Sequence, residues 1–223
     1  MITTGMQRSS EKVRAAADAE QSSSCPAGRS RRKKGLYATE PMLTVPSASP
    51  SVPIVETERL VLRGHRAGDL ADCLALWGDP EVTRFIGGKP STQEEVWSRL
   101  VRYVGHWALL GFGYWVVAEK ESGRFLGEVG FADFRRVIEP SLDGVPEIGW
   151  VIAPHGHGRG YATEAARAAI AWGEKHFGPV RTACIIAPEN EPSIRVAEKC
   201  GYREFSRTTY KDKPTIMFVR ERA

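Results

Sequence analysis

The sequence predicts one α/β (α+β) domain with a mixed, mostly antiparallel sheet, flanking helices and a central strand–glycine loop–helix unit. Strand-like apolar runs outnumber helical ones, which favours hairpins and antiparallel pairing. Only one helical segment, 161–177, separates strands in a way that allows a parallel crossover. Of 223 residues, 42% are apolar and 26% charged, which is enough for one sizeable core.

Residues 1–53 are expected to be a disordered basic tail and residues 54–223 the folded domain. The first segment is rich in Ser, Pro, Ala and Arg, and buries too little surface to offset the entropy of ordering it. It holds eight Lys/Arg and four Asp/Glu, whereas the remainder holds 23 of each. No nucleic-acid partner is therefore expected for the domain. Met42 is another candidate start of translation.

The composition indicates a cytoplasmic protein without a membrane partner or a metal. The longest uncharged run, 103–118, is too short and too interrupted for a membrane span. The N-terminus has no apolar stretch typical of a signal peptide. The cysteines show neither CxxC spacing nor a zinc-like pattern with histidine, so reduced thiols are expected.

Apolar periodicity places the elements before the glycine loop. Their expected order is strand 59–65, helix 69–77, helix 91–110, strands 114–119 and 125–134, and a polar loop 136–146. The spacing of Ser91 and Glu94 is that of a capping box, which predicts the start of the second helix.

The second half predicts the only parallel connection. Its expected order is strand 147–153, glycine-rich turn 154–160, helix 161–177, strand 180–187, helix 190–200, and strands 202–210 and 215–220. Gly201 stands in the favoured position just after a helix end.

The turn PHGHGRG at 154–160 predicts an anion site. A helix N-terminus offers unpaired backbone N–H groups and a partial positive charge. Gly158 and Gly160 remove side chains where a pyrophosphate would approach, while Arg159 adds a cation and His157 a donor. The pattern is neither GxGxxG nor a P-loop, and glycine before a helix also suits a simple turn.

The stretch His157–Ala162 resembles the coenzyme A pyrophosphate loop of the GNAT acetyltransferases, whose pattern is Gln/Arg-x-x-Gly-x-Gly/Ala. The departure is His157, where Gln or Arg is usual. Further likenesses stand in the expected order along the chain, at 147–150 (EIGW), 190–193 (NEPS) and 198–202 (EKCGY). The segments 56–63 and 78–85 are similar in sequence to those of the branch that includes the ribosomal-protein N-terminal acetyltransferases.

The resemblance covers about residues 55–222 and implies an N-acetyltransferase. Such an enzyme moves an acetyl group from acetyl-CoA directly to a primary amine in a ternary complex. A backbone N–H near Val151 or Ile152 would polarise the thioester carbonyl. The residues implied in coenzyme binding are Val151, Ile152, His157, Gly158, Arg159, Gly160, Tyr161, Ala162, Asn190 and Ser193, with Arg195 and Lys199 as cations that could reach the 3′-phosphate.

Glu147, at the head of the central strand, is the best candidate general base, directly or through water. A strand-end surface carboxylate is an equally open interpretation. Glu128 and Asp133 are weaker candidates.

Many family members place a tyrosine four residues before the helix-ending glycine, but this chain has Ala197 there. The branch implies Ser193 as the replacement, with Asn190 beside it. Both residues also suit the cap of a helix.

Three further side chains receive simpler interpretations. Cys184 and Cys200 are expected to be core thiols, and His155 is expected to face solvent.

The likeness to N-terminal acetyltransferases points to a peptide or protein α-amine as the acceptor. The alternatives are a small-molecule amine of the aminoglycoside or polyamine type, and a non-catalytic acyl-coenzyme A binding protein. Residues 85–90, the helix from Ser91 and the loop 136–146 are expected to line the acceptor site. The protein is expected to be a monomer or homodimer.

Overall fold

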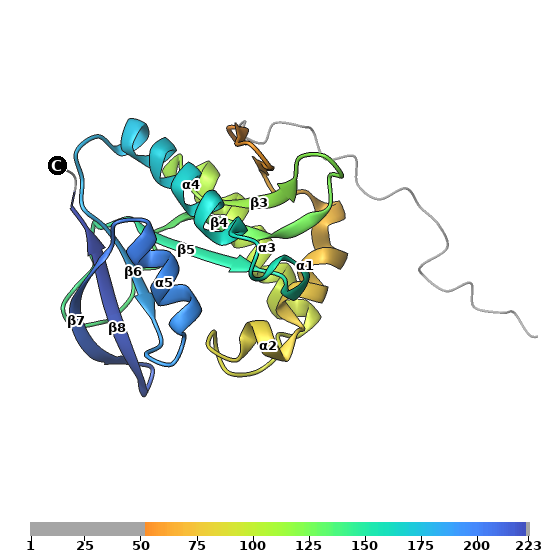
Figure 1. Ribbon diagram of the computed structural model, residues 1–223. Coiled ribbons are helices and arrows are strands. Elements are labelled where there is room, and N and C mark those ends of the chain that lie inside the picture. The colour runs from red at the N-terminus through yellow and green to blue at the C-terminus, as the bar shows by residue number, and fades with distance from the viewer. Residues whose placement is uncertain (1–51, 222–223) are drawn as a thin grey trace, which may run out of the picture. The chain divides into compact units, whose positions relative to one another are not determined.

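The computed structural model describes residues 52–221, so the expected basic tail lies almost wholly outside the described residues. Eight strands form one sheet in the order β1-β2-β3-β4-β5-β6-β8-β7 (Figure 1). The strands are β1 (Val55–Glu56), β2 (Leu60–Arg63), β3 (Tyr114–Glu119), β4 (Phe125–Ala132), β5 (Glu147–Ile152), β6 (Thr182–Ile186), β7 (Arg203–Tyr210) and β8 (Lys213–Arg220).

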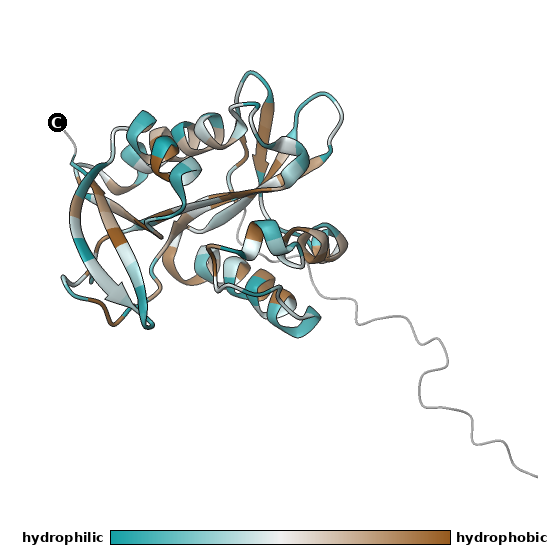
Figure 2. Ribbon diagram, turned by 60° about the horizontal axis from the view of Figure 1, so that its bottom comes forward, coloured by the Kyte–Doolittle hydropathy of each residue, from teal (hydrophilic) through white to brown (hydrophobic). Residues whose placement is uncertain are grey.

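Helices cover both faces of the sheet. They are the 3-10 turn η1 (Ala67–Asp69), α1 (Leu70–Trp77), α2 (Pro80–Thr83), α3 (Gln93–Leu110), the 3-10 turn η2 (Pro154–Gly156), α4 (Tyr161–Phe177) and α5 (Glu191–Lys199). One core cluster joins Ile148 to the apolar stripe of α4, and another joins Val151 to α1 and α3. Figure 2 shows helices on both sides of the sheet, with apolar colouring strongest in the central strands. None of the helices in residues 52–221 combines the length and apolarity needed to cross a membrane.

The start of α3 differs by one residue from the expected capping box. Thr92 and Glu95 form the box, since Thr92 N–H donates to the Glu95 carboxylate (2.7 Å) and Glu95 N–H to the Thr92 hydroxyl (3.2 Å). Ser91 instead donates its N–H to the carbonyl of Trp77 at 2.9 Å. That contact holds Ser91 against the end of α1, so the helix begins one residue later than predicted.

Two further differences are local. The GDPEV stretch was expected only to end a helix, but Asp79 caps the short helix α2 by accepting from Glu81 N–H at 2.8 Å. The final hairpin turns on Lys211 and Asp212, whose φ values are 51° and 61°. Because two residues suffice for this turn, β8 begins at Lys213 rather than at 215.

The predicted parallel connection is confirmed, and it opens the sheet. β5 and β6 run parallel on either side of the crossover through α4, but their register includes a single pair, Glu147 with Ala183. The Ala183 N–H donates to the carbonyl of Pro146 at 3.1 Å. Beyond this point β5 pairs with β4 and β6 with β8, so the two strands diverge toward their carboxyl ends.

The expected core thiols are confirmed. Cys184 and Cys200 are free and buried between the sheet and the helices α4 and α5. Burial raises the pKa of both thiols above its usual range. Neither is suited to act as a nucleophile.

Candidate functional site

The opening between β5 and β6 exposes backbone groups of β5. Ala153 N–H donates to the Leu126 carbonyl of β4 at 2.8 Å, and N–H groups alternate in direction along a strand. Val151 N–H therefore also faces β4, while Ile152 N–H faces the opening. Of the two donors considered from sequence, Ile152 is thus the one directed at the space between the diverging strands.

The glycine turn at 154–160 follows β5 and leads into the N-terminus of α4, next to this opening. Gly158 and Gly160 have φ values of 72° and 79°, a conformation that other residues adopt only with strain. A Cβ at Gly158 would have no neighbour within 4 Å, so the backbone there is bare. Gly160 is the N-cap of the 17-residue α4, and no side chain caps it within the described part of the chain. The first N–H groups and the helix dipole fit an anionic group.

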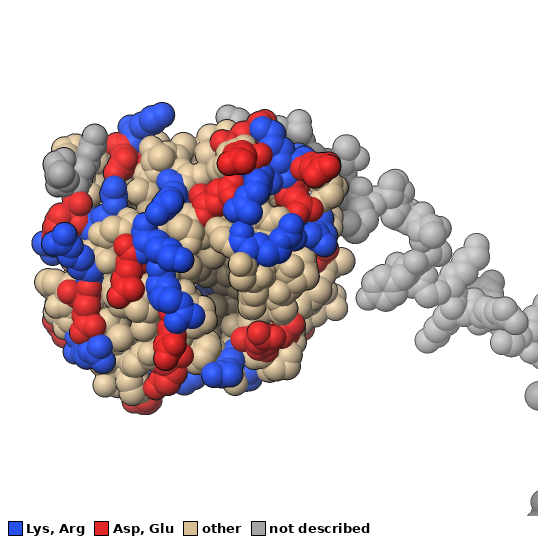
Figure 3. Space-filling view, in the orientation of Figure 1, with Lys and Arg blue, Asp and Glu red and all other residues tan. Residues whose placement is uncertain are grey.

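The surface is hollowed at the same place. Figure 3 shows a depression between α5 and the turn that joins β5 to α4.

Side chains of the turn contact the protein itself. The His157 Nε2 donates to the Ile152 carbonyl at 2.7 Å, which ties the turn to the end of β5. Arg159 lies 3.6 Å from the Glu119 carboxylate and 4.7 Å above the ring of Tyr161. The Tyr161 hydroxyl donates to Glu119 at 2.8 Å. Both side chains therefore brace the turn, and Ala162 in the first turn of α4 is half-buried.

Asn190 caps α5. Its side-chain oxygen accepts from Ser193 N–H at 3.3 Å, and its carbonyl accepts from Ile194 N–H at 3.1 Å. Ser193 is half-buried in the first turn of this helix. Ala197 is fully buried in the core, so no hydroxyl stands where many family members have one.

Glu147 of β5 forms an ion pair with Arg136, and the Glu147 side chain is buried. Arg136 donates through Nε and Nη2 to the two oxygens of Glu147, at 2.6 and 2.8 Å. Its Nη1 donates to the hydroxyl of Tyr210 on β7 at 3.1 Å. Burial works against the charge of Arg136, but the hydrogen bonds and charge of Glu147 outweigh it and raise the Arg136 pKa. Each Glu147 oxygen keeps a second lone pair that can accept a further hydrogen bond.

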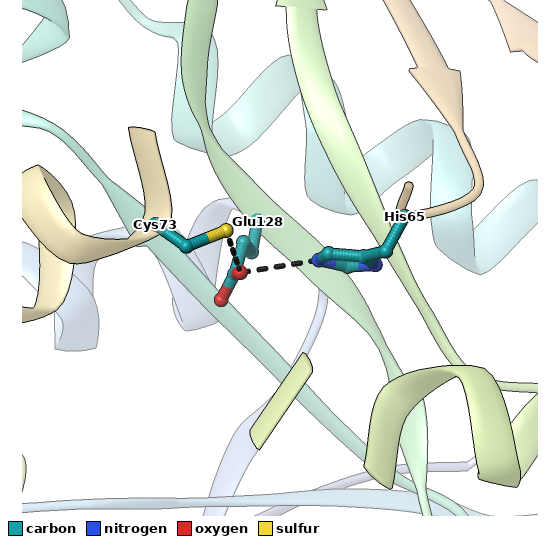
Figure 4. A group of neighbouring side chains, drawn as sticks. All are labelled: His65, Cys73 and Glu128. Carbon is teal, nitrogen blue, oxygen red and sulfur yellow. Dashed lines mark hydrogen bonds and ion pairs between the residues drawn. The ribbon is translucent and has the colours of Figure 1, made fainter. Parts of the chain in front are cut away.

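Glu128 lies in a different environment, shown in Figure 4. One oxygen lies 3.1 Å from His65 Nε2 and 3.5 Å from the Cys73 thiol, and the other accepts from Trp77 Nε1 at 3.0 Å. The His65, Cys73 and Glu128 donor atoms lie within 4.8 Å of one another, as metal ligands would. Burial, followed by the charge of Glu128, raises the Cys73 pKa well above its usual value, so this sulfur remains a thiol that donates. The group fits a hydrogen-bonded link between β4 and α1.

The remaining candidates contact neighbouring groups of the protein. Asp133 follows β4 and pairs with Arg135 at 2.9 Å. His155 is exposed, as expected, and its Nε2 donates to the Phe125 carbonyl at 3.1 Å. Arg195 pairs with Glu191 at 3.2 Å.

Sequence reasoning missed Tyr114, Arg136 and Tyr210. Tyr114 of β3, Gly130 of β4 and Gly149 of β5 are register partners in a row across three strands. A Cβ on Gly149 would lie 2.1 Å from the Tyr114 hydroxyl oxygen. A glycine inside each of two neighbouring strands was the available signal, because such glycines often mark a close approach.

A sheet that opens at its one parallel pair, beside a glycine turn at a helix N-terminus, is typical of an acyl-coenzyme A-dependent transferase. Residues 59–203 match the family described as acetyltransferase (GNAT) domain. The chain belongs to this family, as its sequence predicted. Its relative YkkB from Bacillus subtilis is 36% identical over 172 residues, which cover 74% of this chain and 94% of that protein.

Solved structures agree with this assignment. A GnaT-family acetyltransferase from Bordetella pertussis is 30% identical, with a TM-score of 0.68 over 76% of this chain and 99% of that one. Two more distant structures show the same fold. RimL, a ribosomal L7/L12 α-N-protein acetyltransferase in complex with coenzyme A, is 15% identical (TM-score 0.62; 76% and 98% covered). A spermidine N-acetyltransferase from Vibrio cholerae in complex with coenzyme A and spermine is 17% identical (TM-score 0.60; 74% and 96% covered).

Proposed function

We propose that this protein transfers an acetyl group from acetyl-CoA to a primary amine by direct attack in a ternary complex. The observation that carries the proposal is the divergence of β5 and β6 beyond the Glu147–Ala183 pair, next to the uncapped start of α4. In a chain of the GNAT family, this opening accommodates the pantetheine arm. No covalent enzyme intermediate is needed.

The donor is held mainly by the backbone. The N–H groups of Gly158, Gly160 and the first turn of α4 bind the pyrophosphate. His157 contributes by fixing the turn, because its bond to the Ile152 carbonyl sets the distance between turn and strand. The Ile152 N–H polarises the thioester carbonyl.

The chemistry requires one proton to leave the amine and one to reach the sulfur. The C–N bond forms as the C–S bond breaks. Glu147 accepts the amine proton, through water where the distance demands it. The sulfur leaves as a thiolate and takes a proton from water or from the Ser193 hydroxyl.

The acceptor that this site suits best is the α-amine of a peptide or protein. A free α-amine has a pKa of about 7.7–8.0, against about 10.4 for lysine, so deprotonating lysine requires roughly 3.4 kcal/mol more. Arg136 already occupies one lone pair on each oxygen of Glu147, and Ala197 supplies no acid. A site equipped in this way favours an amine that is partly neutral at physiological pH.

Two alternatives have distinct signatures. A polyamine- or aminoglycoside-type enzyme would acetylate small amines faster than peptides. A non-catalytic acyl-coenzyme A sensor would bind the thioester without turnover.

One assay separates the three functions. Acetyl-CoA binding is measured by calorimetry, and thiol release is followed with a panel of free-N-terminal peptides, polyamines and aminoglycosides. Tight binding with no amine-dependent thiol release would exclude an acetyltransferase.

A further inference from the structure

The two faces of β5 carry different chemistry. Its side chains alternate, so Ile148 and Trp150 pack toward α4 and α5, while Glu147, Gly149 and Val151 face the side of α1 and α3. The phosphate-binding turn belongs to the α4 side. An amine that meets the thioester from the opposite side approaches β5 at Gly149, between Glu147 and Val151.

At that point the structure places a phenol. We propose that the Tyr114 hydroxyl forms the hydrogen-bonding floor of the acceptor-amine subsite, which it reaches because Gly149 of β5 has no side chain. This inference rests on the proposed function and specifies where its acceptor binds. The ligand class is a primary amine in its neutral form.

Gly149 fixes the position of the hydroxyl. A Cβ on Gly149 would lie 2.1 Å from the Tyr114 hydroxyl oxygen, so the phenol reaches the middle of β5 because this position has no side chain. Gly130 lies between them in the register, and a Cβ there would meet the β3 backbone, 2.3 Å from the Gly113 carbonyl oxygen. Tyr103 of α3 stacks on the ring, with centroids 4.4 Å apart and planes 6° apart, which fixes its orientation.

The surroundings keep the phenol neutral. Burial, followed by the charges of Tyr103 and Glu147, raises the Tyr114 pKa well above its usual value, although Arg136 opposes this; Glu128 raises it further. A neutral hydroxyl both donates and accepts one hydrogen bond. By accepting an N–H of the bound amine, it leaves the nitrogen lone pair free to attack the thioester.

Tyr114 is thus a positioning residue for the acceptor. Phenylalanine at this position would fill the same volume and keep the stacking on Tyr103. The hydroxyl is therefore the atom group to test.

The test compares Tyr114→Phe with wild type, and uses Tyr103→Phe as the control that removes a hydroxyl from the stacked partner. For each protein, calorimetry gives the Kd for acetyl-CoA, and initial rates give kcat and KM for the best amine of the panel. In Tyr114→Phe, kcat/KM for the amine should fall about 10- to 100-fold, with an unchanged acetyl-CoA Kd and melting temperature. Tyr103→Phe should retain the wild-type kcat/KM.

The outcomes distinguish this inference from the proposed function. A Tyr114→Phe enzyme with wild-type kcat/KM would contradict the proposed role of Tyr114 but not the proposed acetyltransferase activity. If the wild-type protein binds acetyl-CoA but acetylates no amine, both the proposed acetyltransferase function and the proposed amine subsite are contradicted. An equal loss in both tyrosine variants overturns the subsite, because a general packing effect would then explain the result.

Discussion

Arg136 donates to both oxygens of Glu147 and also reaches the Tyr210 hydroxyl, so one guanidinium joins the central strand to the edge strand β7. Replacing Glu147 with glutamine should therefore have two effects. Loss of the carboxylate partner of the half-buried Arg136 should lower the free energy of unfolding by about 2–4 kcal/mol, measured in urea. Loss of the base should lower the acetylation rate most at pH values below the acceptor's pKa.

A double variant separates the two effects. Glu147→Gln with Arg136→Gln removes both charges and should recover much of the stability without recovering the rate. Recovery of the rate along with the stability would show that Glu147 acts only through structure.

Replacing Gly160 with valine should abolish tight donor binding. If the pyrophosphate binds at the N-terminus of α4 as proposed, the new side chain should obstruct its approach, and calorimetry should give a Kd for acetyl-CoA raised at least about 100-fold. Gly144→Val is the matched control, since Gly144 has a similar φ of 75° and open space around it but lies outside the glycine turn. Unchanged affinity in a folded Gly160→Val protein would rule the site out.

The contacts of the Asp69 carboxylate lead us to expect that the folded protein loses stability in acid. It accepts hydrogen bonds from Arg63 at 2.7 and 2.8 Å and from the Arg66 N–H at 2.7 Å. Burial works against its charge, but these partners outweigh burial and lower its pKa below the ordinary value of 3.8. A depressed carboxyl pKa stabilises the fold above the unfolded-state pKa and stops doing so as pH falls through the folded value.

Wild type should therefore exceed Asp69→Asn in unfolding free energy by about 2 kcal/mol at pH 6. The difference should shrink as pH falls below about 4. Urea titrations over this range measure it. A constant difference down to pH 2 would contradict this account of the Arg63–Asp69 pair.

Acceptor preference can be read from two matched peptides. One has a free N-terminus without lysine, and the other has a blocked N-terminus with one lysine. The free α-amine should react faster at pH 7, and the gap should narrow as pH rises toward about 10, where lysine also becomes neutral. Faster acetylation of the blocked lysine peptide would contradict the hypothesis that the acceptor is an α-amine.

Deletion of residues 1–41 should leave the melting temperature and acetyl transfer nearly unchanged. The segment has no apolar pattern that would dock on a folded domain. Thermal melts and initial rates of full-length and shortened protein test this. A large fall in either quantity on truncation would show that the segment packs on the domain.

Local signals explain what the sequence could predict. The glycine turn and α4 follow from contiguous residues, since Gly158 and Gly160 precede an uninterrupted apolar stripe. The parallel pairing of β5 with β6 was predicted from the position of the helix between them.

Contacts between distant segments could not be read in the same way. The Arg136–Tyr210 bond joins residues 74 positions apart, and it depends on how β7 folds back along β8. The placement of Tyr114 over Gly149 depends on the registers of two strand pairs at once. The shift of the α3 cap to Thr92 depends on a contact between Ser91 and Trp77 that periodicity does not encode.

The alternation of side chains along β5 has a kinetic consequence. Because donor and acceptor would approach this strand from opposite sides, neither would obstruct the entry of the other. Addition in random order is then expected, with initial-rate lines that intersect when both concentrations are varied. The same separation would let changes in residues 85–90 or 136–146 broaden or narrow the range of amines while the affinity for the thioester stays constant.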